Sequence, residues 1–287
     1  MRIVRRRADG YHELESLFLP LDLADELRLE VEPAPALRIA LAVDPPGGQV
    51  PDGEENLAVR AARAFLERAG LSLSVRLRLS KRIPAAAGLG GGSSDAAAVL
   101  RGLAALHPGA LADEELAGLA AGLGADVPFF LESGPRFVTG IGERLEPPPR
   151  PWPSLLLVLA NPGEGLSTVD VFREFDAREP GPTALTGGPG PSNLRSLLEA
   201  AEPDPSDPAP LQALLTNDLE PAAVRLCPAV AALQEALWKA GAGAVAMSGS
   251  GATVFGVFGK EAGARSAAEQ LTATGIWARV ARTRESE

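Results

Sequence analysis

This chain of 287 residues has little cysteine, no long apolar run and a deficit of positive charge, and each of these features excludes a class of protein. The single cysteine, Cys227, excludes a disulfide within the chain and fits a reducing compartment. No run of about 18 apolar residues is present, so we expect no membrane-spanning helix. The net charge of −10 disfavours general binding to nucleic acid or to anionic membranes. We therefore expect a cytoplasmic protein with no nucleic-acid or membrane partner; the oligomeric state cannot be predicted.

Hydrophobic patterning predicts an α+β fold in two domains. Residues 25–32 and 37–43 alternate apolar with polar side chains, and we expect two strands paired as antiparallel neighbours. Further strands are expected at 73–83, 154–161, 244–247, 253–258 and 276–281, and helices at 56–69, 94–106, 113–123, 193–201, 209–226, 228–240 and 260–273. The proline-rich residues 147–153 form the clearest linker, which predicts domains at 1–149 and 150–287.

The most informative stretch is residues 84–98, in which a glycine-rich turn runs directly into a helix. We name its central part, residues 88–94, the glycine segment; it consists of Gly88, Leu89, Gly90, Gly91, Gly92, Ser93 and Ser94. Glycines let a backbone approach a ligand closely, and a helix N-terminus offers free N–H groups and a positive dipole end. The segment therefore predicts a phosphate site. Its spacing is neither that of a Walker A loop nor that of a dinucleotide-binding turn.

Lys81 ends the strand that leads to this stretch. Counting by twos from Leu73 through Leu79 places Lys81 on the buried face of the strand. A lysine there can simply extend its ammonium out of the core edge, or it can serve the phosphate site that follows. We favour the second interpretation because of that proximity.

The pattern P-x-x-x-G-L-G-G-G-S-S-D-A-A at 84–97 resembles the phosphate loop of the GHMP small-molecule kinases. Within this superfamily the chain is most similar to the kinases of a cytidine diphosphate-linked methylerythritol in isoprenoid biosynthesis. Five further segments carry this similarity in the family's order: RADGYHELESLF (7–18), ENLAVRAA (55–62), LGADVPFFL (123–131), TNDLEPAA (216–223) and MSGSGAT (247–253). The resemblance implies an S5-like N-terminal half, a ferredoxin-like C-terminal half, an active site between them, and ATP with Mg²⁺ as cofactors.

The same resemblance implies roles for particular residues. The glycine segment, Asn56 and Lys81 would bind ATP, and Asp126 would orient or deprotonate the accepting 2-hydroxyl. From the residues alone, Asn56 and Asp126 can equally be helix caps. The resemblance also implies four residues around the cytosine ring: Tyr11 and His12 would stack on it and hydrogen-bond to it, Phe172 would lie on its other side, and Thr168 would lie nearby. From the residues alone, Tyr11 and His12 can simply pin a turn, and Phe172 can be core.

The sequence departs from the family at one place. The family carries a Pro-Ala-Lys-x-Asn segment about ten residues before its Asp-Gly-Tyr-His turn, and here the sequence given starts at Met1-Arg-Ile-Val. That lysine would lower the pKa of the catalytic aspartate and balance its charge. We expect a longer form of the chain to be the active one. The alternatives are a GHMP kinase for another small alcohol, or a catalytically impaired nucleotide-binding form.

Overall fold

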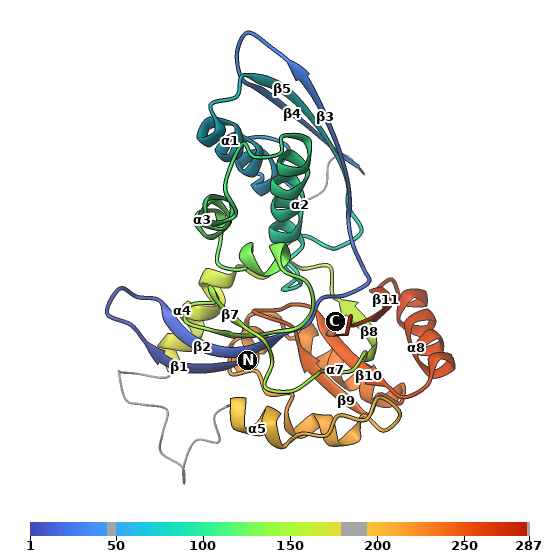
Figure 1. Cartoon of the computed structure of the whole chain (residues 1–287). Coiled ribbons are helices and arrows are strands. Elements are labelled where there is room, and N and C mark those ends of the chain that lie inside the picture. Colours follow the sequence, from blue (N-terminus) through green and yellow to red (C-terminus); the bar gives the residue numbers. More distant parts are fainter. Residues whose placement is uncertain (45–49, 179–193, 286–287) are drawn as a thin grey trace. The chain divides into compact units, whose positions relative to one another are not determined.

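The computed structural model describes residues 1–44, 50–178 and 194–285. Its contacts divide the chain into two compact units (Figure 1). The first unit comprises Met1–Leu23, Ala86–Leu89 and Gly134–Glu287, and the second comprises Ala24–Ala85 and Gly90–Ser133. This division differs from the predicted domains 1–149 and 150–287, because residues on both sides of position 150 belong to the first unit. A functional boundary near residue 150 stays a prediction.

The second unit contains a three-stranded sheet in the order β3-β5-β4. β3 (Glu26–Pro33) runs antiparallel to β5 (Leu73–Ser80), and β4 (Arg38–Asp44) runs parallel to β5. The expected direct pairing of the two strands at 25–32 and 37–43 is therefore wrong. The register sets apolar residues of β3 and of β4 directly beside the row of Val75, Leu77 and Leu79 in β5, so the three strands present one continuous apolar face.

The helices of the second unit bury that row. α1 (Leu57–Ala69), α2 (Gly91–Leu106) and α3 (Asp113–Leu123) share one apolar cluster with it, and a short 3₁₀ helix, η1 (Pro128–Leu131), follows α3. α1 begins and ends as the sequence predicts, with Asn56 as its N-cap and Gly70 in the left-handed conformation at its C-terminus. α2 begins at Gly91 rather than at residue 94, so Ser93 and Ser94 lie inside its first turn.

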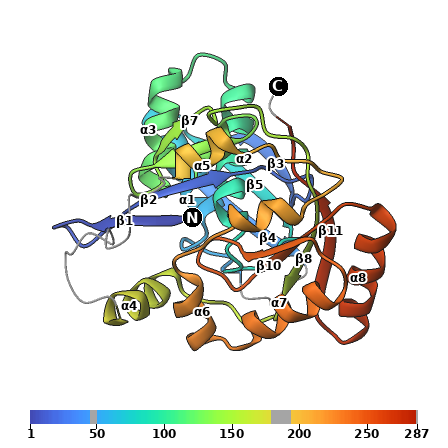
Figure 2. The same ribbon diagram turned by 90° about the horizontal axis from the view of Figure 1, so that it is seen from below.

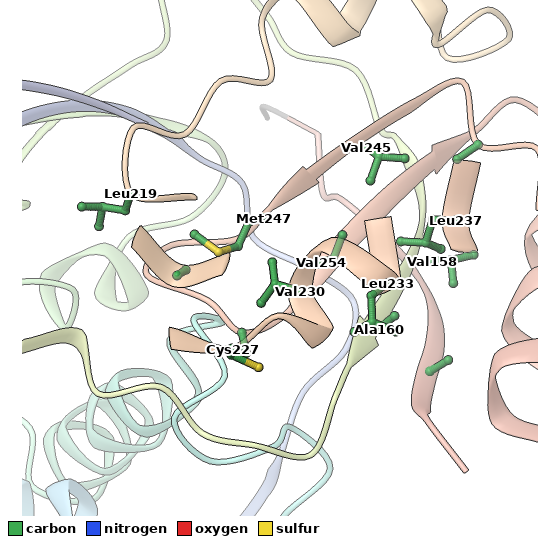
Figure 3. Packing of buried hydrophobic residues seen from close by; sticks show 14 of the residues in the cluster. Val158, Ala160, Leu219, Cys227, Val230, Leu233, Leu237, Val245, Met247 and Val254 are labelled. Carbon is green, nitrogen blue, oxygen red and sulfur yellow. The ribbon is translucent and has the colours of Figure 1, made fainter. Parts of the chain in front are cut away.

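The first unit is built on an antiparallel sheet in the order β11-β8-β10-β9. Its strands are β8 (Leu156–Asn161), β9 (Ala244–Met247), β10 (Val254–Phe258) and β11 (Trp277–Arg282). Every residue of β8 is buried, as expected for a central strand covered on both faces. On one face its alternate residues pack with α7 (Ala229–Lys239) and α8 (Glu261–Ala273) (Figures 1 and 2). Figure 3 shows this cluster from close by, with Val158, Val230, Leu237 and Met247 among its members.

A second sheet of the first unit has the order β1-β2-β6-β7, and the sequence patterns did not predict it. It consists of β1 (Arg2–Arg6), β2 (His12–Phe18), β6 (Arg136–Thr139) and β7 (Arg144–Glu146). These strands are short, and their register pairs Ser16 with Val138 across more than a hundred residues of chain. Such pairing cannot be read from local alternation.

The remaining elements connect these sheets. They are α4 (Thr168–Arg178), α5 (Leu194–Ala200), η2 (Ala209–Ala213) and α6 (Glu220–Leu226). The single helix expected at 209–226 is wrong: η2 and α6 are separate, and Asn217 caps the chain between them by accepting from Leu219 N. Within the described part of the chain, no helix combines the length and the apolarity that crossing a membrane requires. The predicted α+β class is confirmed.

Candidate active site

Residues 90–94 of the glycine segment lie in the second unit and form the N-cap and first turn of α2. Gly90 is the N-cap in the left-handed conformation, and the first backbone bond of the helix runs from Ser94 N to Gly90 O. The N–H groups of Gly91, Gly92 and Ser93 therefore have no partner within the helix. No side chain caps this end, so these donors and the positive end of the helix dipole are free for an anion.

Neighbouring side chains leave little room for a larger residue at Gly90 and Gly91, and more at Gly92. A Cβ added at Gly90, whose φ is +67°, would lie 2.7 Å from the Phe130 ring. A Cβ at Gly91 would lie 3.0 Å from Ile83 and 3.4 Å from Lys81 Nζ, and one at Gly92 would lie 3.6 Å from Leu57. Glycine is thus required by conformation at Gly90 and by packing at Gly90 and Gly91.

Lys81 lies behind this turn, on the buried face as the sequence predicts. Its Nζ donates to Asp25 Oδ2 at 2.5 Å and to Asp95 Oδ2 at 2.9 Å. All three side chains are nearly buried: Lys81 is 10% exposed, Asp25 2% and Asp95 7%. Burial raises the pKa of the Asp95 carboxyl to about 6, against the opposing attraction of the Lys81 ammonium. The ammonium is therefore committed to two carboxylates.

Asn56 is buried and both ends of its amide are used. Its Oδ1 accepts from Ala58 N at 2.8 Å, and its Nδ2 donates to Pro51 O at 2.7 Å. The N-cap interpretation is confirmed. Leu57 packs close to Gly92, so the N-terminus of α1 lies beside that of α2. This position is compatible with a nucleotide contact by Asn56, which stays a prediction.

Asp126 lies in the turn between α3 and η1. The N-cap of η1 is Val127 and this helix has no side-chain capping bond, so the interpretation of Asp126 as a simple cap is wrong. Within the described ranges the Asp126 carboxylate has no hydrogen-bond or salt-bridge partner. Burial raises its pKa. An unpartnered, largely desolvated carboxylate is the form that a proton acceptor takes in an active site.

In the first unit, the beginning of the glycine segment packs against the turn at 248–251. Ser248 Oγ donates to Gly88 O at 2.9 Å, and Thr253 N donates to Ala87 O at 3.2 Å. A Cβ added at Gly88, whose φ is +73°, would lie 2.3 Å from Ser248 O. Two backbones meet here without side chains between them. Leu89 packs its side chain on an apolar cluster of this unit and so anchors the segment.

The turn at 248–251 is itself braced from two sides. Asn217 Nδ2 donates to Met247 O at 3.1 Å and to Gly249 O at 2.8 Å. Thr168, at the start of α4, shares a hydrogen bond of 2.8 Å with Ser250 Oγ. The structure therefore gives Thr168 a partner in the turn, and its predicted contact with substrate is untested.

One helical turn further along α4, Phe172 stacks on His12. Their ring centroids are 4.9 Å apart with an interplanar angle of 22°, which leaves no room for a third ring between them. His12 is 7% exposed, and its Nε2 lies 2.8 Å from Asp176 Oδ1. Tyr11, by contrast, is 60% exposed. The structure stacks His12 directly on Phe172, whereas the sequence-based expectation set Phe172 across the cytosine ring from Tyr11 and His12. Tyr11 presents its ring to solvent, and the contacts of these residues with cytosine stay predictions.

Sequence reasoning missed three carboxylates that the structure places beside predicted site residues: Asp25, Asp95 and Asp176. Asp25 lies opposite Lys81 because β3 pairs Glu26 with Ser80, a strand pairing that the sequence did not predict. Asp95 was recognised only as part of a helix start. Asp176 follows Phe172 by one helical turn, a spacing that places both on one face of α4.

These features agree with comparisons to known proteins. Models for the N-terminal and C-terminal domains of GHMP kinases match residues 56–134 and 194–276. The chain belongs to the GHMP kinase family. Within it, the chain is 40% identical over 275 residues to the 4-diphosphocytidyl-2-C-methyl-D-erythritol kinase of Citrifermentans bemidjiense, covering 96% of this chain and 91% of the relative. The enzyme of the same name from Anaeromyxobacter dehalogenans is 44% identical over 93% of this chain and 80% of its own.

Solved structures give the same result. The crystal structure of a 4-(cytidine 5'-diphospho)-2C-methyl-D-erythritol kinase is 41% identical, with a TM-score of 0.74 over 98% of this chain and 94% of that one. A homoserine kinase from Cytophaga hutchinsonii is 19% identical with a TM-score of 0.67 over 93% of this chain and 88% of its own, which shows the shared fold alone.

Proposed function

We propose that this chain transfers the γ-phosphoryl group of ATP to the 2-hydroxyl of 4-diphosphocytidyl-2-C-methyl-D-erythritol, a step of isoprenoid precursor biosynthesis. The observation that carries the proposal is the similarity to kinases of this name at about 40% identity over more than nine tenths of the chain. We also propose that the protein is cytoplasmic and has no nucleic-acid or membrane partner. The net charge of −10 supports the lack of such partners, because both nucleic acids and most membrane surfaces are negatively charged.

The donor side rests on the N-terminus of α2. Phosphoryl transfer depends mainly on positioning and on stabilising charge around the transferred group. The unpaired N–H groups of Gly91, Gly92 and Ser93 would bind the ATP phosphates, and the α2 dipole would favour their negative charge. Gly88, held by Ser248, would keep the start of the segment free of side chains.

Asp126 would serve the accepting hydroxyl. Its carboxylate has no competing partner within the described ranges, and a raised pKa makes a carboxylate a better proton acceptor. It would orient the hydroxyl and accept its proton as the bond to phosphorus forms. This role is supported by the failure of the capping interpretation.

The cytosine ring would contact the His12–Phe172 pair. His12 is oriented by Asp176, and an imidazole so held can offer its other ring nitrogen, Nδ1, to the polar edge of a base. The Phe172 ring and the exposed Tyr11 ring supply apolar faces for stacking. Thr168 would contribute from the first turn of α4.

Mg²⁺ is part of the proposal as an ion carried by ATP. The described residues contain no group of three or more histidine, cysteine or acidic side chains that could hold a metal. Magnesium bound to a nucleotide keeps several waters and needs only one or two protein oxygens beyond the phosphates, so the chain fits this mode. The Ser93 hydroxyl, in the first turn of α2, is a candidate ligand.

A substrate panel tests the proposal. ADP release is measured with ATP, Mg²⁺ and either the diphosphocytidyl substrate, mevalonate or homoserine. We expect turnover with the first alcohol only. Turnover with a different alcohol would favour another GHMP kinase activity, and ATP binding without turnover on any alcohol would favour a binding-only form.

The expectation about the Pro-Ala-Lys-x-Asn segment stays a prediction and has its own test. Adding such a segment before Met1 is expected to raise kcat with the diphosphocytidyl substrate. Replacing its lysine by methionine should remove the gain. Equal kcat values in the presence and absence of the added lysine would contradict the expectation.

A further inference from the structure

We propose that Asp25, Lys81 and Asp95 form an ionic clamp that fixes the chain on both sides of the glycine segment, so that Lys81 acts as a positioning residue rather than as a phosphate ligand. This inference deepens the proposed function and rests on its ATP site. It differs from the sequence-based expectation, in which Lys81 contacts the nucleotide directly.

The clamp reaches both flanks of the segment. Asp25 Oδ1 accepts from the backbone N–H groups of Arg82 at 2.6 Å and of Ile83 at 3.0 Å, which fixes the chain before the segment. Asp25 Oδ2 accepts a hydrogen bond from Lys81 Nζ, which also donates to Asp95 Oδ2. Asp95 is the residue directly after Ser94, so this bond fixes the chain after the segment. One buried network therefore sets where the chain leaves β5 and how the first turn of α2 is rotated.

Physical arguments favour clamping over direct binding. Glycine has the largest backbone freedom of any residue, so a segment with four glycines needs external constraints to keep one conformation. A bond between residues 81 and 95 closes the intervening chain into a loop and removes part of that freedom. Moving the Lys81 ammonium to a phosphate would leave two buried carboxylates without their counter-charge, which is strongly unfavourable.

Asp95→Asn separates the two roles. If Lys81 binds phosphate, removing the Asp95 charge frees the ammonium, and affinity for ATP stays the same or rises. If Lys81 is a clamp, the bond to α2 weakens, and we expect affinity for a non-hydrolysable ATP analogue to fall about 10-fold by calorimetry. The KM for ATP should rise likewise, while the KM for the acceptor alcohol stays constant. A mere loss of folded protein would instead lower kcat and leave both KM values unchanged.

Hydrogen exchange tests the clamp without any ligand. In Asp95→Asn and Lys81→Met, peptides covering residues 83–95 should exchange about 10-fold faster than in the unmodified protein. The matched control is Arg76→Met, which removes a positive charge from the exposed face of the same strand, where Arg76 pairs with Glu30 and Glu32. Unchanged exchange in Asp95→Asn, or tighter ATP binding, would overturn the clamp. If the unmodified protein does not phosphorylate the diphosphocytidyl substrate but the two variants still exchange faster, the proposed substrate is wrong and the clamp stands.

Discussion

The His12 imidazole lies face to face with the Phe172 ring, at 4.9 Å between centroids, and its Nε2 edge lies 2.8 Å from Asp176 Oδ1. The pair joins β2 to α4 in the first unit. Because the stack leaves no gap, a base would have to lie on an outer face or edge of the pair.

Phe172→Ala should weaken acceptor binding selectively. Losing one aromatic face removes a contribution of about 0.5–1.5 kcal/mol beyond area burial, so we expect the KM for the diphosphocytidyl substrate to rise about 2- to 12-fold. Steady-state kinetics with each substrate varied separately measures this. Val169→Ala, at an exposed position of the same helix, is the matched control. An equal rise in the KM for ATP would contradict the assignment.

Gly88→Ala should disable the glycine segment. The new Cβ would lie 2.3 Å from the Ser248 carbonyl, and a non-glycine residue at φ +73° costs about 1–3 kcal/mol in addition. We expect kcat/KM for ATP to fall at least 100-fold, together with a lower Tm. Gly53→Ala serves as control, since an added Cβ there meets nothing within 4 Å. Similar activity in the two variants would show that the packing against the turn at 248–251 is unimportant.

Two glycines in α3 should be stabilising sites. Gly118 and Gly122 lie inside this helix, and an added Cβ at either meets nothing within 4 Å. Replacing each by alanine removes backbone freedom from the unfolded chain and should raise the free energy of unfolding by about 0.5–1 kcal/mol. Urea unfolding monitored by circular dichroism measures the change. A decrease would mean that these positions contact something beyond the chain itself.

Asp126→Asn should lower activity and raise stability at the same time. The amide cannot accept the proton, so kcat should fall about 10²- to 10⁴-fold. Burial raises the pKa of Asp126 in the folded protein, so the unfolded chain binds fewer protons between the two pKa values and stability falls as pH rises through that window. The variant should therefore have a higher Tm than the unmodified protein at neutral pH.

The Tm difference between Asp126→Asn and the unmodified protein should depend on pH. The gain in Tm should shrink as pH is lowered toward the ordinary aspartate pKa of about 3.9, because both states then carry a neutral group. Thermal melts over a pH series measure it. A gain that stays constant with pH would mean that the Asn side chain stabilises by a new contact rather than by removing a buried charge.

Local signals in the sequence were sufficient for much of the second unit. Asn56 and Gly70 predicted the ends of α1, and the row from Leu73 to Leu79 predicted both β5 and the direction of Lys81. Each of these signals acts within a few residues of chain. Strand order was not accessible in the same way, because β4 reaches its parallel partner β5 only across α1.

The candidate site was predictable to a similar extent. The glycine segment and Asp126 were predicted partly from the residues and partly from the family resemblance, and the resemblance named His12 and Phe172 without predicting that they stack on each other. The partners of Lys81 and His12 were not, since Asp25 lies 56 residues from Lys81 and Asp176 lies 164 residues from His12. Partners at such separations follow from tertiary packing, which no local pattern encodes.

The way the chain divides between the two units also has a consequence for synthesis on the ribosome. The residues of the second unit have all been made once residue 133 has emerged, whereas β2, the partner of β1, pairs with β6, which is made later. Nascent chains arrested soon after residue 133 should therefore hold a protease-resistant 24–133 core with an unprotected N-terminal arm. Residues 1–23 would thus be made before the second unit and would complete their sheet only after it.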